Sequence, residues 1–219
     1  MLTRIVSFQE LIEVGRWRAN LHVHTNNEMK SSKYDMVPLG DVVKESTAAA
    51  EPQSQGGEFY YIGLENVTPI TGDPMNISLV GPEEVRSRSK MFRKGNILYA
   101  RLRPYLRKVL LVEEPFEFGL CSTEFIILDV DPSVVLPQYL RDLLSSESVT
   151  SYLSRLQGGA ALPRVSSKDL LAMEIPVPPQ RVQMRIVEEL ERIKEKRHQL
   201  MDELEVLKED QQELIKKVF

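Results

Sequence analysis

The residues with the clearest chemical potential are the cations of one segment, residues 86–108. This segment holds nine Arg and Lys residues and no Asp or Glu, although the 219-residue chain has a net charge of −4 at pH 7. The remainder of the chain therefore carries −13. A basic stretch in an acidic protein concentrates positive potential in one place, where phosphate can bind. The candidate residues are Arg86, Arg88, Lys90, Arg93, Lys94, Arg101, Arg103, Arg107 and Lys108.

Tyr105 lies between Arg103 and Arg107 and adds an aromatic ring to these cations. Guanidinium groups beside a ring are typical of surfaces that hold a phosphate and contact a base. The alternative is a solvated edge strand whose cations protect it from aggregation, with Tyr105 half-buried. The lack of acidic residues in the segment favours a nucleic-acid interface.

Other chemistry finds little support in the sequence. His22 and His24 alternate as on a strand, but His198 is the one further histidine, and no Cys or carboxylate is spaced to complete a metal site. Cys121 lies in an apolar stretch and is the single cysteine, so we expect a buried, inert thiol and no internal disulfide. No glycine-rich cofactor loop, methyltransferase tetrapeptide or nuclease cluster is present. We therefore expect no catalytic residue, metal or cofactor.

A hairpin is predicted to position the basic residues. Residues 97–102 (ILYARL) predict a strand, Pro104 a break, and residues 108–112 (KVLLV) a second strand. Because strand side chains alternate, Arg101 and Arg103 are expected to share one face.

The rest of the body predicts a mixed sheet and helix domain of the α+β class. Strand-like apolar runs come first, and helical spacing follows over residues 137–156, as two short helices, without regular βαβ alternation. We expect a helix and loop extension over residues 1–35 and the globular domain over residues 36–178. The chain has no run of 18 apolar residues and no signal-peptide core, so the expected location is the cytoplasm, away from membranes.

Residues 179–219 predict one long helix with a coiled-coil seam. Pro178 and Pro179 mark its start, and no Gly or Pro occurs in residues 180–219. Apolar residues recur alternately four and three apart, which is the heptad pattern of a helix that has a partner. Arg197 and Gln211 are the polar residues of the seam, and the alternative is an amphipathic helix folded onto its own domain. The predicted partner-helix residues are Ile186, Leu190, Ile193, Leu200, Leu204, Leu207, Leu214 and Val218.

Five stretches of the chain, in order, resemble the DNA specificity (S) subunits of type I restriction-modification systems. The most specific is IPVPP followed by Gln183 and Arg185-Ile186-Val187, which is similar to the start of that family's spacer helix. The resemblance covers about residues 37–219 and implies a target recognition domain followed by a spacer helix. Typical members carry two of each, so the chain resembles a half-length member or half of a longer polypeptide. The five stretches are YIGLENV (61–67), KGNILYARLRPYLRKV (94–109), STEFIIL (122–128), GGAALPRVSSKDL (158–170) and IPVPPQRVQMRIV (175–187).

The resemblance implies double-stranded DNA as the ligand, read by the loop within residues 67–89 and by residues 101–108. It also implies methyltransferase (M) and restriction (R) subunits as partners, which supply the catalysis, so that this chain is not itself an enzyme. Two copies would pair their long helices, and each domain would read one half of a split site in the major groove. The rival interpretations are a coiled-coil scaffold protein and the recognition segment of a fused restriction-methylation enzyme.

The sequence leaves the direction of helix pairing ambiguous. A parallel homodimer would match Glu189 with Lys194, and Glu203 with Lys208, across the seam. The family resemblance implies antiparallel helices instead, and we follow it.

Overall fold

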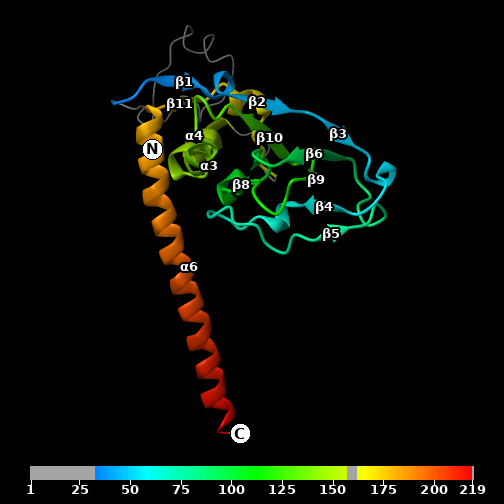
Figure 1. The fold of residues 1–219 in the computed structure, drawn as a ribbon, viewed down its shortest axis with the longest axis vertical. Coiled ribbons are helices and arrows are strands. Elements are labelled where there is room, and N and C mark those ends of the chain that lie inside the picture. Colours follow the sequence, from blue (N-terminus) through cyan, green and yellow to red (C-terminus); the bar gives the residue numbers. More distant parts are fainter. Residues whose placement is uncertain (1–32, 157–161, 219) are drawn as a thin grey trace, which may run out of the picture. The chain divides into compact units, whose positions relative to one another are not determined.

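The computed structural model describes residues 33–156 and 162–218, shown in Figure 1. The chain divides into a first unit that ends at Pro178 and a second unit, Pro179–Phe219. The predicted N-terminal helix and loop, including His22 and His24, lies outside the described residues apart from its last three positions.

The first unit is built around two sheets that share one core. The four-stranded sheet is antiparallel throughout and has the order β2 (Val43–Ser46), β10 (Phe125–Val130), β7 (Ile97–Ala100), β8 (Val109–Leu111). In the five-stranded sheet the β4–β9 pair is parallel, and the order is β3 (Ala49–Ala50), β6 (Ser89–Arg93), β9 (Phe118–Ser122), β4 (Phe59–Ile62), β5 (Leu79–Val80). A separate two-stranded ribbon joins β1 (Met36–Pro38) to β11 (Glu174–Pro176).

The core lies where the two sheets meet. Phe92 and Cys121 of the five-stranded sheet pack in one buried cluster with Leu98, Phe125 and Ile127 of the four-stranded sheet. Each of these side chains is at most 3% exposed. A fully buried side chain of this kind contributes about 1.5–3 kcal/mol, so this cluster fixes the strands from which the surface loops emerge.

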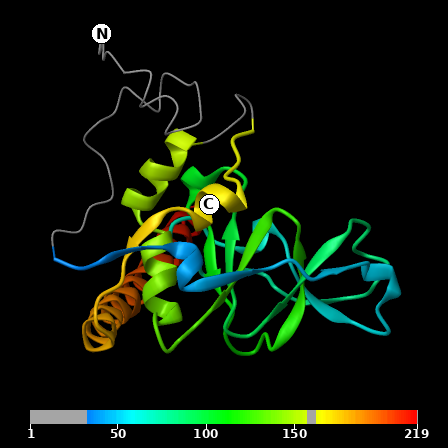
Figure 2. The same cartoon turned by 90° about the horizontal axis from the view of Figure 1, so that it is seen from above.

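Short helices complete the first unit. The helices α3 (Pro137–Leu144) and α4 (Glu147–Leu156) pack against β8 and against the 3-10 helix η4 (Pro104–Leu106) respectively. In Figures 1 and 2 the five-stranded sheet extends away from these two helices. The other short elements of the described residues are η1 (Leu39–Asp41), η2 (Pro52–Ser54), η3 (Leu64–Asn66) and α5 (Ser167–Leu171).

Sequence signals at helix ends agree with the structure. Ser166 caps α5, since its Oγ accepts a hydrogen bond of 3.0 Å from the backbone N–H of Asp169.

The second unit is one continuous helix, α6 (Gln180–Lys216), of 37 residues, which is about 56 Å long at 1.5 Å per residue. The α+β class with a long C-terminal helix is therefore confirmed. No described helix combines the length and the apolar character that a membrane span requires.

The predicted hairpin is confirmed in its pairing but wrong in its detail. Strands β7 and β8 pair antiparallel, with Ile97 opposite Leu111. However, β7 ends at Ala100, so Arg101 and Arg103 do not alternate on a strand. Arg103 has a φ of 50°, in the left-handed region, and Pro104 begins η4. Residues 101–103 instead bond to a distant segment, since the carbonyl of Arg101 accepts from Val165 and the N–H of Arg103 donates to Pro163. Pro104 has no N–H with which to continue a ladder.

Candidate nucleic-acid interface

Three segments far apart in sequence meet at the end of the β7–β8 hairpin. The backbone N–H of Ile70 donates to the carbonyl of Leu106 at 3.0 Å, and that of Arg103 donates to Pro163 at 2.9 Å. The N–H of Val165 donates in turn to the carbonyl of Arg101 at 3.0 Å. We refer to these segments, residues 68–76, 101–107 and 162–165, as the loop cluster.

The loop cluster presents cations that the fold does not use. Within the described part of the chain, Arg101, Arg103 and Arg107 form no ion pair with an acidic residue. Arg103 is exposed, and so is Tyr105, at 53%. The Nε of Arg101 is buried and has no hydrogen-bond partner among the described residues. These groups retain the capacity to bind an anion or a polar base edge.

The backbone holds two of these arginines in an unusual conformation. Arg103 and Arg107 flank η4 with φ values of 50° and 51°, a region that L-residues other than Asn and Asp rarely adopt. Arg107 is kept there because its N–H donates to the carbonyl of Pro104 at 2.9 Å. Such conformations cost about 1 kcal/mol or more each, and they are concentrated at functional sites.

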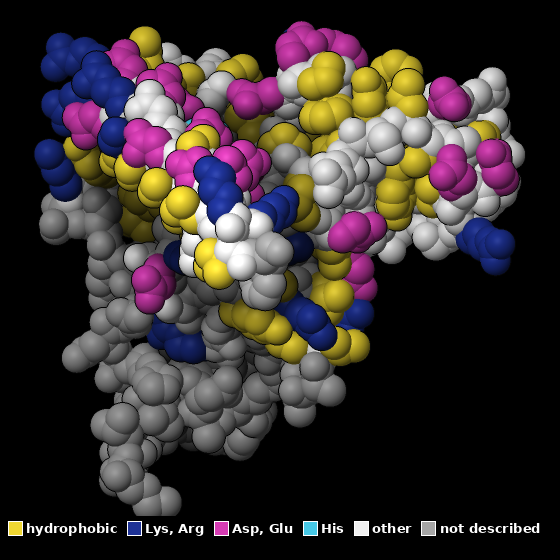
Figure 3. Space-filling view, turned by 90° about the horizontal axis from the view of Figure 1, so that it is seen from below, with side chains coloured by type: hydrophobic (Ala, Val, Ile, Leu, Met, Phe, Trp, Pro, Cys, Tyr) yellow, Lys and Arg dark blue, Asp and Glu magenta, His cyan; other side chains and the backbone are white. Residues whose placement is uncertain are grey.

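The other predicted cations are mostly engaged by the fold. Acidic partners that are remote in sequence pair with several of them, and on the face shown in Figure 3 acidic and basic side chains are interspersed. Arg86 joins the arginines of the loop cluster as a cation without an ion pair among the described residues. The engaged pairs are Arg88 with Glu51 (3.6 Å), Lys90 with Glu45 (3.8 Å), Arg93 with Asp129 (2.6 Å), and Lys94 with Glu114 and with Glu117 (3.3 Å).

Two lysines also make hydrogen bonds to the backbone. The Nζ of Lys90 donates to the carbonyl of Phe125 at 2.8 Å, and that of Lys108 donates to Leu64 at 2.7 Å. Hydrogen bonding and charge from Asp129 raise the pKa of Arg93. Within the described residues, ion pairs thus compensate four of the nine positive charges of residues 86–108. Three of the cations without an ion pair, Arg101, Arg103 and Arg107, lie together in the loop cluster.

An ion pair that could not be predicted from the sequence holds the loop cluster together. Arg164 contacts both carboxylate oxygens of Glu124, with its Nη2 at 2.8 Å from Oε1 and its Nε at 3.2 Å from Oε2. The carbonyl of Glu124 accepts a hydrogen bond of 2.9 Å from the N–H of Arg101. Glu124 thus links the β9–β10 turn to two segments of the cluster. The sequence carries no spacing signal for the pair, because its members lie 40 residues apart.

Side-chain hydrogen bonds shape the segment of residues 68–76. The Nδ2 of Asn66 donates to the carbonyls of Met75 and Asn76, both at 3.0 Å, while its Oδ1 accepts from the N–H of Gly63 at 2.8 Å. Gly72 has a φ of 71°, and a Cβ there would lie 2.1 Å from the carbonyl oxygen of Val109, so only glycine fits. This segment is consequently pressed against β8.

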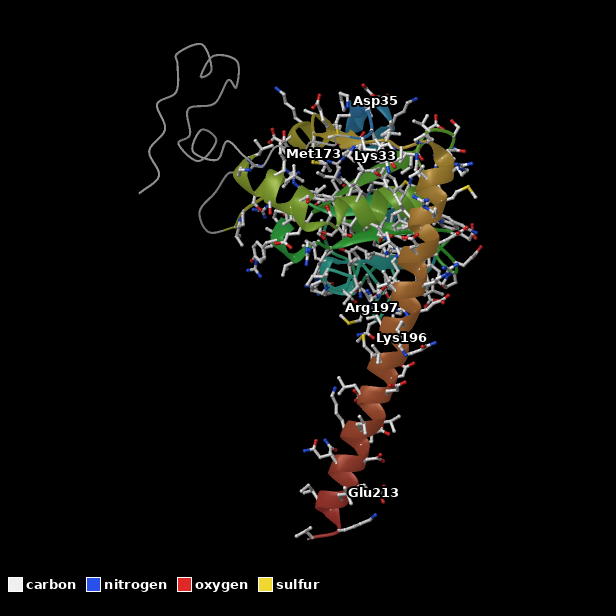
Figure 4. The ribbon with its side chains drawn as sticks, turned by 90° about the vertical axis from the view of Figure 1, so that its left-hand side faces the viewer. Lys33, Asp35, Met173, Lys196, Arg197 and Glu213 are labelled. Carbon is white, nitrogen blue, oxygen red and sulfur yellow. The ribbon has the colours of Figure 1, made fainter. Side chains whose placement is uncertain are left out.

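The seam of α6 is the second candidate site. Lys196 and Arg197, labelled in Figure 4, line a shallow groove on this helix together with apolar seam residues. Ile186 and Leu190 are partly buried. The other predicted seam residues are more than half exposed: Ile193 (64%), Leu200 (51%), Leu204 (52%), Leu207 (63%), Leu214 (64%) and Val218 (79%).

The lysines considered for parallel pairing make contacts within their own helix. Lys194 pairs with Glu191 at 2.6 Å, and Lys208 pairs with Glu205 at 3.0 Å. Neither contact requires a second helix. Such surface pairs contribute about 0.3–0.5 kcal/mol each and have little influence on the direction of pairing.

The described residues also bear on metal binding and on cysteine chemistry. They contain no group of three or more His, Cys, Asp or Glu side chains that could hold a metal ion. Cys121 is buried in the core, as expected, and burial raises the pKa of its thiol to about 12. A thiol with so high a pKa is not nucleophilic at neutral pH.

Two curated proteins of known function resemble this chain in sequence. No protein-family model matches the chain. The chain is 28% identical over 133 residues to the type I restriction enzyme EcoDI specificity subunit of Escherichia coli, which is 61% of this chain and 29% of that protein. It is 26% identical over 101 residues to the HindI specificity subunit of Haemophilus influenzae, 45% of this chain and 22% of that protein.

A solved structure supports the same relationship. The HsdS subunit from Thermoanaerobacter tengcongensis matches 78% of this chain and 44% of its own, with 26% identity and a TM-score of 0.68. This chain is a relative of the type I restriction enzyme specificity subunits. It spans less than half the length of the relatives that it matches. The predicted resemblance to these subunits is thereby confirmed, and the half-length form stays a prediction.

Proposed function

We propose that this specificity-subunit relative is a non-catalytic DNA-recognition protein that reads one half of a split site in duplex DNA. The observation that carries the proposal is the loop cluster, where three arginines make no ion pair within the described residues. Tyr105 is exposed beside them. In this proposal the domain is the target recognition domain, α6 is the spacer helix, and methyltransferase and restriction subunits in the cytoplasm supply the chemistry.

Base reading falls to the arginines of the loop cluster. An arginine can donate two parallel hydrogen bonds to O6 and N7 of guanine in the major groove, and this geometry discriminates between bases. The exposed position of Arg103 suits this role. The engaged cations, such as Arg93 and Lys94, contribute to the field that positions the phosphate backbone.

Two copies of the chain pair through α6 in this proposal. The exposed apolar seam supports pairing, because a helix with such a stripe gains free energy when a second helix covers it. A parallel homodimer would place Arg197 directly against the Arg197 of a second copy, and two like charges would meet inside the seam. In an antiparallel pair the same position faces a leucine or isoleucine, and its long side chain can reach solvent. We therefore favour the antiparallel arrangement.

The proposal is tested by DNA binding with single arginine variants. Arg103→Gln and Arg101→Ala are each expected to weaken specific binding by about 1–3 kcal/mol, a loss of roughly 5-fold to 150-fold in affinity. Arg88→Ala is the matched control, because Arg88 is an exposed cation that already pairs with Glu51. Fluorescence anisotropy on a duplex selected from a random library, measured at several salt concentrations, gives the affinities. Unchanged affinity in both variants would remove the loop cluster from the interface.

The partner subunits are tested by co-expression. The full chain, produced with a type I methyltransferase subunit from the same genome, is expected to co-purify with it. Failure of the pair to associate, together with retained DNA binding, would favour the segment of a fused enzyme over a separate subunit.

A further inference from the structure

Ile70 combines two properties that are seldom found together. Its side chain is 55% exposed, and its backbone has a φ of 70°. A β-branched residue in the left-handed region is a steric outlier, whereas glycine or asparagine would occupy the same conformation easily. Isolated exposed apolar residues are common on protein surfaces, but one that is kept at a conformational cost points to a use for its side chain.

The surroundings of Ile70 hold it firmly in this conformation. Its N–H donates to the carbonyl of Leu106, and both backbone polar groups of the next residue, Thr71, are hydrogen-bonded. The N–H of Thr71 donates to the carbonyl of Pro69 at 2.8 Å, and its own carbonyl accepts from Nη1 of Arg141 at 3.3 Å. These hydrogen bonds hold the loop through its backbone groups, and the apolar side chain of Ile70 takes no part in them.

The position of Ile70 within the loop cluster identifies the chemistry that it meets. One backbone hydrogen bond joins it to η4, the helix that carries Tyr105 and is flanked by Arg103 and Arg107. A surface built from arginines and a tyrosine would lie against base edges in the proposed function. The apolar group that the major groove displays is the C5-methyl of thymine, and apolar side chains are its usual contacts.

We infer that Ile70 contacts the C5-methyl group of a thymine in the half-site, and so selects that base. This inference rests on the proposed function, since it assigns a ligand to the same DNA-reading surface. It adds an apolar determinant to the hydrogen-bonding ones, in a segment separated from residues 101–107 by about 30 positions in the sequence.

The test removes single methyl groups from the DNA. A duplex selected from a random library by the full wild-type chain is remade with uracil in place of thymine, one position at a time. One substitution is expected to weaken wild-type binding about threefold to fivefold, which is the transfer free energy of one methyl group. Ile70→Ala is expected to bind the thymine and uracil duplexes equally, while Leu79→Ala, an exposed residue of β5 outside the loop cluster, keeps the difference.

A stability measurement separates this role from a structural one. Because glycine relieves the strain at a φ of 70°, Ile70→Gly is expected to melt no lower than the wild type and still to lose the methyl preference. A clear drop in melting temperature would assign Ile70 to folding and overturn the inference.

The outcomes of the binding experiment are distinguishable. If no sequence is enriched by the selection, the proposed function itself fails. If a sequence is enriched but no uracil substitution matters, or the preference survives Ile70→Ala, the inference fails alone. If Ile70 instead wedged between base steps, no uracil substitution would matter, and 2-aminopurine fluorescence would detect unstacked bases. That outcome also overturns the inference.

Discussion

Removing two leucines from the seam of α6 should separate the proposed homodimer. Leu200 and Leu204 are 51% and 52% exposed in the single chain, so about half of each side chain remains to be buried by a partner. Full burial of a leucine contributes about 1.5–3 kcal/mol, and half of that is about 1 kcal/mol. Each substitution occurs in both copies, so the double variant Leu200→Ala/Leu204→Ala loses about 4 kcal/mol. The dimer dissociation constant should rise on the order of 10³-fold.

Sedimentation equilibrium measures this change directly. Alanine is the best helix former, so α6 should keep its helicity in the variant, and far-UV circular dichroism checks this. Val206→Ala is the matched control, because Val206 is 56% exposed on the same part of the helix but lies outside the seam. A double variant that remains dimeric at the wild-type concentration would refute the assignment of the seam. Equal dissociation of the Val206 variant would refute the heptad register.

Three further predictions concern the first unit. Glu124→Gln removes the charge that Arg164 contacts at 2.8 Å. Because both side chains are partly exposed, the substitution should lower the free energy of unfolding in urea by only about 1 kcal/mol. An unchanged midpoint of urea unfolding would show that the pair is not needed to hold the loops. Asn66→Ala removes three hydrogen bonds and should make residues 68–76 more sensitive to protease, and equal cleavage rates in the variant and the wild type would contradict this. Burial raises the pKa of Cys121 from its ordinary 9.0 to about 12, so between these pH values the thiol is deprotonated in the unfolded chain and protonated in the native chain. The free energy of unfolding should therefore fall as pH rises, by up to about 1.4 kcal/mol per pH unit. A Cys121→Ala variant whose free energy of unfolding has the same pH dependence would contradict this origin.

Local signals in the sequence were sufficient for the long helix and for the hairpin. The heptad spacing and the absence of Gly and Pro predicted α6, because both properties depend on residues a few positions apart. The pairing of β7 with β8 likewise followed from two adjacent apolar runs around Pro104. These elements are determined mainly by their own sequence, and so they can be predicted without tertiary information.

The state of each cation could not be predicted in the same way. Arg93 and Arg103 look equivalent in the sequence, but Asp129, 36 residues away from Arg93, engages the first and not the second. The pairing of Arg164 with Glu124 and the meeting of Ile70 with Leu106 depend equally on long-range packing. The left-handed conformation of Arg103 also escaped prediction, because a hydrogen bond from its N–H to Pro163 helps to fix it. The basic segment is recognisable from the sequence, but the residues within it that remain available are not.

The ribbon formed by β1 and β11 has a consequence for how such a domain can be exchanged. Met36 lies opposite Pro176, so the first described strand and the last strand before α6 are neighbours in one ribbon. Domains whose ends lie close together tolerate insertion and transplantation well. A recombination event that joins a foreign body at this ribbon would import a complete new set of surface loops through two adjacent junctions, leaving α6 and its heptads untouched.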